Sequence, residues 1–123
     1  MIIISLNMKG LGGGTKTKYL RNIIGKEGAE LVCIQKTKLV VMTDARCFFL
    51  WVENNIGWLH NKGAEGVGSI LTMWHKEAFN YESHIKGKVF MAVFGQHIKS
   101  KANIMMANVY APCNGGEKKI LWE

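Results

Sequence analysis

The stretch that most constrains the fold is Leu31 to Lys38, LVCIQKTK. Its four apolar residues, Leu31 to Ile34, run without alternation, which is typical of a strand buried on both faces of a sheet. Polar residues follow at once, from Gln35 to Lys38. Because open α/β folds commonly bind ligands where their strands end, this polar segment is a candidate functional site. The plainer alternative is that Lys36 and Lys38 are solvated loop lysines.

The composition favours one globular domain with a basic surface. The chain has 123 residues, of which 48% are hydrophobic and 20% charged, enough to build a core and too apolar for a disordered chain. The formal net charge is +7, and seven of the 16 basic residues but only two of the nine acidic ones fall in residues 1 to 40. Such a balance attracts polyanions, nucleic acid first and anionic membranes second, although many basic proteins bind neither tightly.

Cysteine usage and hydropathy indicate an intracellular location, nuclear or cytoplasmic. The three cysteines, Cys33, Cys47 and Cys113, are an odd number without a CxxC pair, which supports neither a disulfide framework nor a zinc site. The apolar start, Met1 to Ile4, is too short for a signal peptide, and no run approaches the length of a membrane span. We expect no membrane association.

The N-terminal segment predicts a strand, Ile2 to Asn7, that runs into a glycine-rich turn. The glycines at 12 to 14 do not form a nucleotide-triphosphate loop, because no Gly-Lys-Ser/Thr follows at the required spacing. Asn7 ends the strand. An asparagine at a strand exit is most simply a turn-former that bonds its own backbone, and a functional role is the alternative.

A helix is predicted next. Its apolar stripe consists of Tyr19, Leu20, Ile23 and Ile24, and Gly28 is its expected terminator. The opposite face is basic, either simply solvated or in contact with nucleic acid. With the strand at Leu31 this gives a βαβ-like unit, although the pattern leaves open whether the two strands are adjacent or parallel.

The rest of the chain is β-like. The candidate strands are Phe48 to Val52, Gly68 to Trp74, Lys88 to Ile98 and Ala102 to Tyr110. Tyr110 closes the last strand and could bring its hydroxyl to a sheet edge beside Asn7 and Lys36; taken alone, it is more simply a packing residue. The four histidines are scattered without paired spacing, which argues against a metal cluster or a catalytic triad. Residues 117 to 123 look like the start of an amphipathic helix, so we expect a truncated domain.

Three motifs occur in order: SLNMKGLG (Ser5 to Gly12), LVCIQKTK (Leu31 to Lys38) and NVYAPCN (Asn108 to Asn114). Together they resemble the first half of the endonuclease/exonuclease/phosphatase superfamily, which includes the exonuclease-III-like apurinic endonucleases. The likeness is strongest to the endonuclease domain of plant LINE-type retrotransposons, and GAEGVGSILTMW (Gly63 to Trp74) is similar to a glycine-rich strand entry of that group.

The resemblance implies a partial four-layer α/β sandwich of the DNase-I-like kind, with residues 1–123 forming the N-terminal half of a single truncated domain. It also implies Mg²⁺- or Mn²⁺-dependent cleavage of phosphodiester bonds. In that family the asparagine matched by Asn7 orients the metal and phosphate environment, and the tyrosine matched by Tyr110 contacts the scissile phosphate. Lys36 stands where the family has a metal-binding glutamate. The later Gly-Asp-x-Asn and Asp-His motifs would lie beyond Glu123.

A lysine at a magnesium-ligand position opposes metal binding. Mg²⁺ is held mainly by carboxylates, whereas an ammonium about 4 Å away would repel it by about 8 kcal/mol at an effective dielectric constant of about 20. A lysine could still hold a phosphate in place of the cation.

Three hypotheses follow. The first is a catalytically inactive nuclease domain of a retroelement. The second is a basic nucleic-acid-binding remnant that binds DNA through the basic face of the first helix and the basic C-terminal strands, with no small-molecule cofactor. Lys9, Lys36 and Lys38 are its candidate contacts with DNA. The third is a half-sandwich that does not fold stably alone, because its sheet faces and edges are uncovered. The sequence leaves the oligomeric state open.

Overall fold

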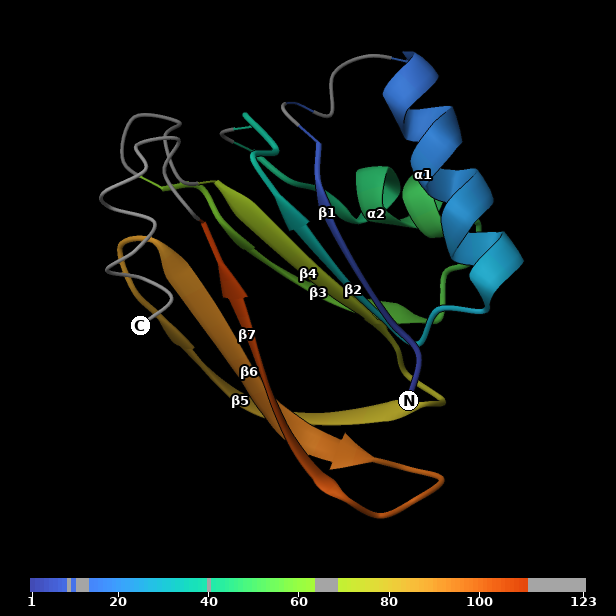
Figure 1. Ribbon diagram of the computed structural model, residues 1–123, viewed down its shortest axis with the longest axis vertical. Coiled ribbons are helices and arrows are strands. Elements are labelled where there is room, and N and C mark those ends of the chain that lie inside the picture. Colours follow the sequence, from blue (N-terminus) through green and yellow to red (C-terminus); the bar gives the residue numbers. More distant parts are fainter. Residues whose placement is uncertain (9, 11–13, 40, 64–68, 111–123) are drawn as a thin grey trace.

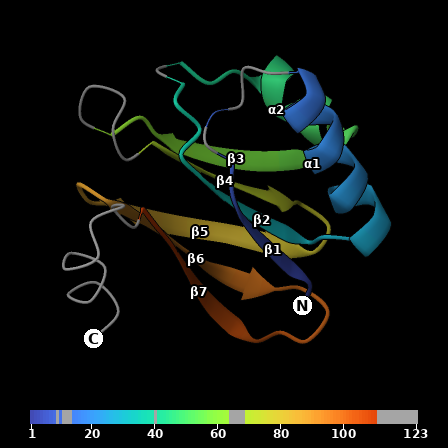
Figure 2. The ribbon, with the colours of Figure 1, turned by 45° about the horizontal axis from the view of Figure 1, so that its top comes forward.

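A computed structural model describes residues 1–8, 10, 14–39, 41–63 and 69–110, which form three layers (Figure 1). Two helices cover one face of a four-stranded sheet, and a three-stranded sheet lies on the other face (Figure 2). In chain order the elements are β1 (Ile3–Asn7), α1 (Gly14–Glu27), β2 (Leu31–Gln35), α2 (Asp44–Trp51), β3 (Ile56–Asn61), β4 (Ile70–His75), β5 (Phe79–Lys86), β6 (Phe90–His97) and β7 (Asn103–Val109).

The first sheet has the strand order β1-β2-β4-β3 and contains one parallel pair. Strands β1 and β2 are adjacent and parallel, with Ile3 opposite Leu31 and Asn7 opposite Gln35. This settles what the sequence left open about the βαβ-like unit. Strand β4 is antiparallel to both β2 and β3, so β1, β2 and β3 all end at the same edge of the sheet.

Strand β2 is buried on both faces, as its unbroken apolar run predicts. Val32 and Ile34 belong to the core between the sheet and the helices, while Leu31 and Cys33 belong to the core between the two sheets. Each of these four side chains is at most 2% exposed. The strand therefore joins the two cores, because successive side chains point to opposite faces.

Helix α1 follows the predicted pattern in part. Leu20 and Ile24 are buried against the sheet, but Tyr19 is 56% exposed, so the buried stripe is narrower than the four apolar residues suggest. Gly28 ends the helix with φ +64°, the left-handed conformation that glycine adopts without a steric penalty.

The predicted strand at Phe48 to Val52 is wrong: this segment lies in helix α2 and its C-cap. Thr43 caps the helix by accepting a hydrogen bond from the Arg46 amide at 3.2 Å. The buried residues are Cys47, Leu50 and Trp51, at the spacing of one helical face. The periodicity of a short apolar run does not distinguish a strand from a helix. Here the Thr43 N-cap favours the helix.

Two strands were missed, β3 and β5, because each lacks a clear apolar pattern. In β3, Gly57 interrupts the apolar pattern. Its lack of a side chain has a packing reason, since a Cβ atom there would lie 2.4 Å from the Trp74 ring. In β5, Tyr81 stacks on Trp74 with ring centroids 5.1 Å apart and thereby joins the two sheets.

The remaining strand predictions are confirmed with small shifts of boundary: β4, β6 and β7 fall within or beside the expected ranges. Lys9, most of the glycine-rich turn and the expected helix at residues 117 to 123 lie outside the described residues. Within the described part of the chain, neither helix has the length and apolarity needed to span a membrane.

Candidate functional site

Strands from both sheets end side by side at one edge of the sandwich, which we call the strand-end edge. In Figure 1, β1 and β7 both run upward to it. Its described polar residues include Asn7, Gln35, Lys36, Thr37, Lys38, His60, Asn61, Lys86 and Tyr110. The sequence predicted four of these, Asn7, Lys36, Lys38 and Tyr110, as site residues.

A buried amide network fixes β7 against the first sheet just below this edge. Asn108 is 1% exposed and donates to the Leu71 carbonyl at 2.9 Å and to the Thr72 hydroxyl at 3.1 Å. Its Oδ1 accepts from Gln35 Nε2 at 2.8 Å, and the same Gln35 amide donates to the Ser5 hydroxyl at 3.2 Å. Satisfied buried polar groups of this kind specify one arrangement of the layers.

Lys36 and Tyr110 are brought together. The Lys36 ammonium lies over the Tyr110 ring, 5.7 Å from its centroid, within the range of a cation–π contact. Asn7 is opposite Gln35 in the parallel pair, so it lies at the same level as the residue preceding Lys36. Lys36 and Tyr110 therefore meet, and Asn7 lies on the neighbouring strand at the level of Gln35. The chemical roles of all three residues remain predictions.

The turn after β2 also places Lys38 at this edge. Its amide donates to the Ser69 hydroxyl at 2.8 Å. Its side chain passes close to Gly10, where a Cβ atom would lie 3.6 Å from Lys38 Cδ. The Gly10 amide in turn donates to the Lys36 carbonyl at 2.6 Å, so the segment after β1 is tied to the turn after β2. Lys9, the third predicted nucleic-acid-binding lysine, lies outside the described residues.

Sequence reasoning missed Thr37, His60 and Lys86. Thr37 is fully buried, and its hydroxyl lies 3.3 Å from His60 Nε2. Lys86 Nζ donates to the His60 carbonyl at 2.9 Å. Burial, with a smaller contribution from the positive charge of Lys86, lowers the pKa of His60 below its ordinary value of 6.5. Thr37 was inside a quoted motif, but nothing in the sequence points to His60 or Lys86, because strands β3 and β5 were not predicted.

The hairpin between β5 and β6 completes a ring of contacts around the edge. Asn61 Nδ2 donates to the Gly87 carbonyl at 2.8 Å and to the Phe90 carbonyl at 3.2 Å. The Tyr110 amide donates to the Val89 carbonyl at 2.7 Å. Hydrogen bonds thus link Thr37 to His60, Asn61 to the hairpin and the hairpin to Tyr110. The contact of Lys36 with Tyr110 closes the ring, which joins both sheets.

The electrostatics of this edge favour an anion. Lys36, Lys38 and Lys86 bring three ammonium groups to it. Helix α1 begins on this side of the sheet, after β1, with no acidic residue in its first turn and with Lys16 and Lys18 near its start. The N-terminal end of a helix carries a partial positive charge, which adds to that of the lysines.

The described residues of the edge do not fit a magnesium ion. They offer amides, an imidazole, a phenol and ammonium groups, whereas Mg²⁺ is bound chiefly through carboxylates. Over the part of the chain that the structure describes, no group of three or more His, Cys, Asp and Glu side chains could hold a metal ion. Lys36, at the end of β2, adds a repulsive charge.

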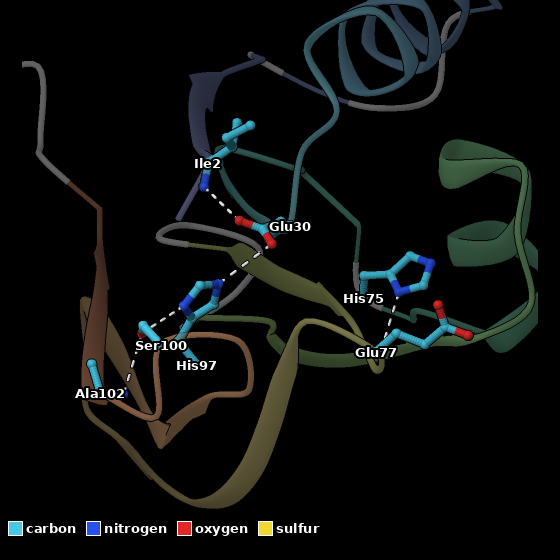
Figure 3. A network of polar contacts seen from close by, with 7 residues as sticks. All are labelled: Ile2, Glu30, His75, Glu77, His97, Ser100 and Ala102. Atoms are coloured by element: carbon cyan, nitrogen blue, oxygen red, sulfur yellow. Dashed lines mark hydrogen bonds and ion pairs between the residues drawn. The ribbon is translucent and has the colours of Figure 1, made fainter.

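The opposite edge carries a different, acid-containing network (Figure 3). Glu30 accepts from the Ile2 amide at 2.8 Å and faces His97 Nε2 at 3.4 Å, while His97 Nδ1 lies 2.8 Å from the Ser100 hydroxyl. The Ile2 hydrogen bond, and to a lesser extent His97, lowers the pKa of Glu30. On the same side, His75 is paired with Glu53. The Glu30 contacts join the starts of β1 and β2 to β6 and the turn after it, and the His75 contact joins the end of β4 to the segment after α2. Both therefore have a structural explanation.

Comparison with known proteins identifies the fold of the chain but assigns it to no family. No protein-family model matches the chain, and no curated protein matches it. Among solved structures, the chain is similar to the AP endonuclease LMAP from Leishmania major, with a TM-score of 0.68 and 17% identity over 98% of this chain and 43% of that one.

Two further solved structures are similar. The first is TDP2 from D. rerio, complexed with a single-strand DNA product, with a TM-score of 0.63 and 13% identity over 98% of this chain and 50% of that one. The second is the catalytic domain of Xenopus laevis APE2, with a TM-score of 0.60 and 16% identity over 96% of this chain and 47% of that one. The chain thus has the mixed α/β, two-sheet architecture of the DNase-I-like fold and spans about half the length of these structures.

Proposed function

We propose that the chain binds the phosphodiester backbone of nucleic acid, DNA in the first place, at the strand-end edge without hydrolysing it. The observation that carries the proposal is the position of Lys36, whose ammonium group lies over the Tyr110 ring at the end of the central buried strand. Lys38 and Lys86 add positive charge at the same edge, and Lys9 is a further candidate contact. Each lysine can donate a charge-assisted hydrogen bond to a phosphate oxygen.

The absence of hydrolysis is part of the proposal. By resemblance, Lys36 occupies the position of a metal-binding glutamate, and the described donors of the edge do not suit Mg²⁺ or Mn²⁺. Phosphodiester cleavage by such enzymes depends on a metal that polarises the phosphate and activates water. This chain's own groups would hold a phosphate with Lys36, orient it with Asn7 and Tyr110, and leave it intact.

The test uses the purified 123-residue chain and a labelled DNA duplex. Fluorescence anisotropy at increasing salt should give an affinity that falls with a log–log slope of about −0.9 per phosphate neutralised. Chelator should leave the affinity unchanged, and supercoiled plasmid should remain uncut with Mg²⁺ or Mn²⁺. Chelator-sensitive nicking would overturn the inactive assignment, and absent or salt-insensitive binding would overturn the binding assignment.

A matched pair of variants locates the interface. Replacing Lys36 and Lys38 by alanine removes two charges from the strand-end edge, and replacing Lys99 and Lys101 removes two from the turn after β6, at the opposite edge. The Lys36, Lys38 double variant should show a shallower salt dependence of affinity, equivalent to about two fewer phosphates neutralised. The Lys99, Lys101 double variant should keep a slope near that of the parent chain. Equal effects would indicate non-specific attraction to the net charge.

The finer ancestry is also a proposal. The three ordered motifs support descent from the endonuclease domain of a LINE-type retrotransposon, with residues 1–123 as its N-terminal half. Sequencing the gene beyond Glu123 tests this, since a frame interrupted before the Gly-Asp-x-Asn and Asp-His motifs is expected. An uninterrupted frame containing Gly-Asp-x-Asn and Asp-His would instead indicate that only Lys36 separates this chain from an active enzyme.

A further inference from the structure

The turn that carries Lys36 and Lys38 has an unusual backbone. Both lysines adopt left-handed conformations, with φ of 57° and 55°, and the residue between them, Thr37, is fully buried. Non-glycine residues in this region are strained and persist only where the surrounding structure holds them. Two such residues flanking a buried threonine therefore indicate that Thr37 anchors the turn.

Three kinds of contact hold Thr37 in place. Its amide donates to the Ser69 carbonyl at 3.2 Å. Its hydroxyl oxygen accepts from the Leu39 amide at 3.4 Å and lies 3.3 Å from His60 Nε2. The Lys38 amide donates to the Ser69 hydroxyl, so the amides of Thr37 and Lys38 both bond Ser69, at the entry to β4. The Thr37 hydroxyl links the turn to His60 of β3.

His60 is suited to accept a hydrogen bond from the Thr37 hydroxyl. Burial and the nearby Lys86 keep its imidazole neutral at neutral pH, so Nε2 can carry a lone pair with the proton on Nδ1. The Thr37 hydroxyl then donates a hydrogen bond to His60 and accepts one from the Leu39 amide, so it acts as donor and as acceptor. The His60 backbone is itself held by β3 pairing and by the bond from Lys86.

We propose that Thr37 and His60 are positioning residues for the lysine pair, by which we mean Lys36 and Lys38. Their hydrogen bond fixes the turn so that the Lys36 ammonium lies over the Tyr110 ring and both lysines face the ligand. This inference rests on the proposed nucleic-acid binding for its function but not for its geometry. Neither Thr37 nor His60 contacts the phosphate.

The test compares Thr37→Val with Thr37→Ser. Valine keeps the shape and removes the hydroxyl, whereas serine keeps the hydroxyl. Thr37→Val should weaken duplex DNA binding about 3- to 10-fold, comparable to Lys36→Ala, and Thr37→Ser should restore most of the affinity. In a Lys36→Ala, Lys38→Ala background, Thr37→Val should have no further effect, because the threonine acts through the lysines. Ile24→Val, which removes one buried methyl group under α1, is the control for lost stability.

A second measurement needs no ligand. The Lys36 Cε protons should show a ring-current shift in the NMR spectrum that disappears in Tyr110→Leu. The same shift should disappear in Thr37→Val and in His60→Phe, and persist in Thr37→Ser and in Ile24→Val. A Lys36 shift that is unchanged in Thr37→Val would overturn the positioning role.

The two proposals fail in different ways. If the parent chain binds no DNA, the proposed function is wrong, and the ring-current measurement still decides the role of Thr37. If DNA binds but Thr37→Val and Ile24→Val weaken it equally, Thr37 affects binding only through stability and the inference is wrong.

Discussion

Lys36 is the residue on which the chemistry of the strand-end edge depends. It follows a strand whose side chains are all uncharged and lies over Tyr110 rather than extending into open solvent. A carboxylate in its place would attract a cation to the same point where the ammonium now attracts an anion. We therefore expect this one side chain to decide whether the position attracts a cation or an anion.

We expect Lys36→Glu to introduce weak binding of Mn²⁺, detected as paramagnetic broadening of the Tyr110 NMR signals at millimolar metal, and to abolish DNA binding. Lys38→Glu makes the same change of charge two residues away and should broaden Tyr110 much less. Equal broadening in the two variants would mean that Mn²⁺ binding depends on the net charge of the chain and not on the position of residue 36.

Cys33 and Cys47 are expected to be chemically inert in the folded chain. Burial raises the pKa of each thiol to about 12, so about one thiol in ten thousand is ionised at a pH of about 8. In a Cys113→Ser variant, a thiol-specific reagent should react slowly without denaturant and with both thiols once urea unfolds the chain. Rapid labelling of the native variant would show that the cores open readily.

Among the elements, two glycines test the packing of α1 and β3. Gly25 lies in α1 with no atom within 4 Å of the position of a Cβ, whereas a Cβ on Gly57 would meet the Trp74 ring. Gly25→Ala should therefore raise the free energy of unfolding by about 1 kcal/mol through helix propensity. Gly57→Ala should lower it by about 1–3 kcal/mol through overpacking. Urea unfolding of both variants measures the difference, and effects of the same sign would contradict the β3–β4 packing described above.

The elements also show where the sequence was informative. The run Leu31 to Ile34 and the terminator Gly28 predicted β2 and the end of α1 correctly, because burial on both faces and a positive φ each demand particular residues. The apolar run at Phe48 to Val52 predicted a strand where α2 lies, since short apolar runs suit both. Strand β5 lies at the edge of its sheet with most of its residues exposed, and it has no apolar pattern that would reveal it.

At the scale of the whole molecule, contacts at both edges hold the layers together. The strand-end edge is joined by Asn108 and the hairpin after β5, and the opposite edge by Glu30 and His97. Because the two cores share strand β2, we expect one cooperative unfolding transition, monitored by tryptophan fluorescence against temperature. A broad transition that depends on protein concentration would support the hypothesis that the chain does not fold stably alone.

The Glu30 network predicts a pH dependence of stability. The folded state lowers the pKa of Glu30 below its ordinary value of 4.5, so the unfolded state binds the proton more tightly. Its contribution is therefore complete above that value and is lost as the pH falls through the pKa of the folded state. Glu30→Gln should cost about 0.5–1 kcal/mol at neutral pH, and the difference from the parent chain should shrink on acidification. A difference that stays constant with pH would assign the cost to lost hydrogen bonding alone.

By itself the sequence determined the buried central strand, the helix before it, the basic charge and the order of the three motifs, because these depend on local composition and spacing. It also indicated Asn7, Lys36 and Tyr110 as residues that could meet. Only the tertiary structure decided that Lys36 lies over Tyr110 and that Thr37, His60 and Lys86 support the turn. Those contacts join strands from different sheets, and their geometry follows from how the layers pack, which no periodicity along the chain records.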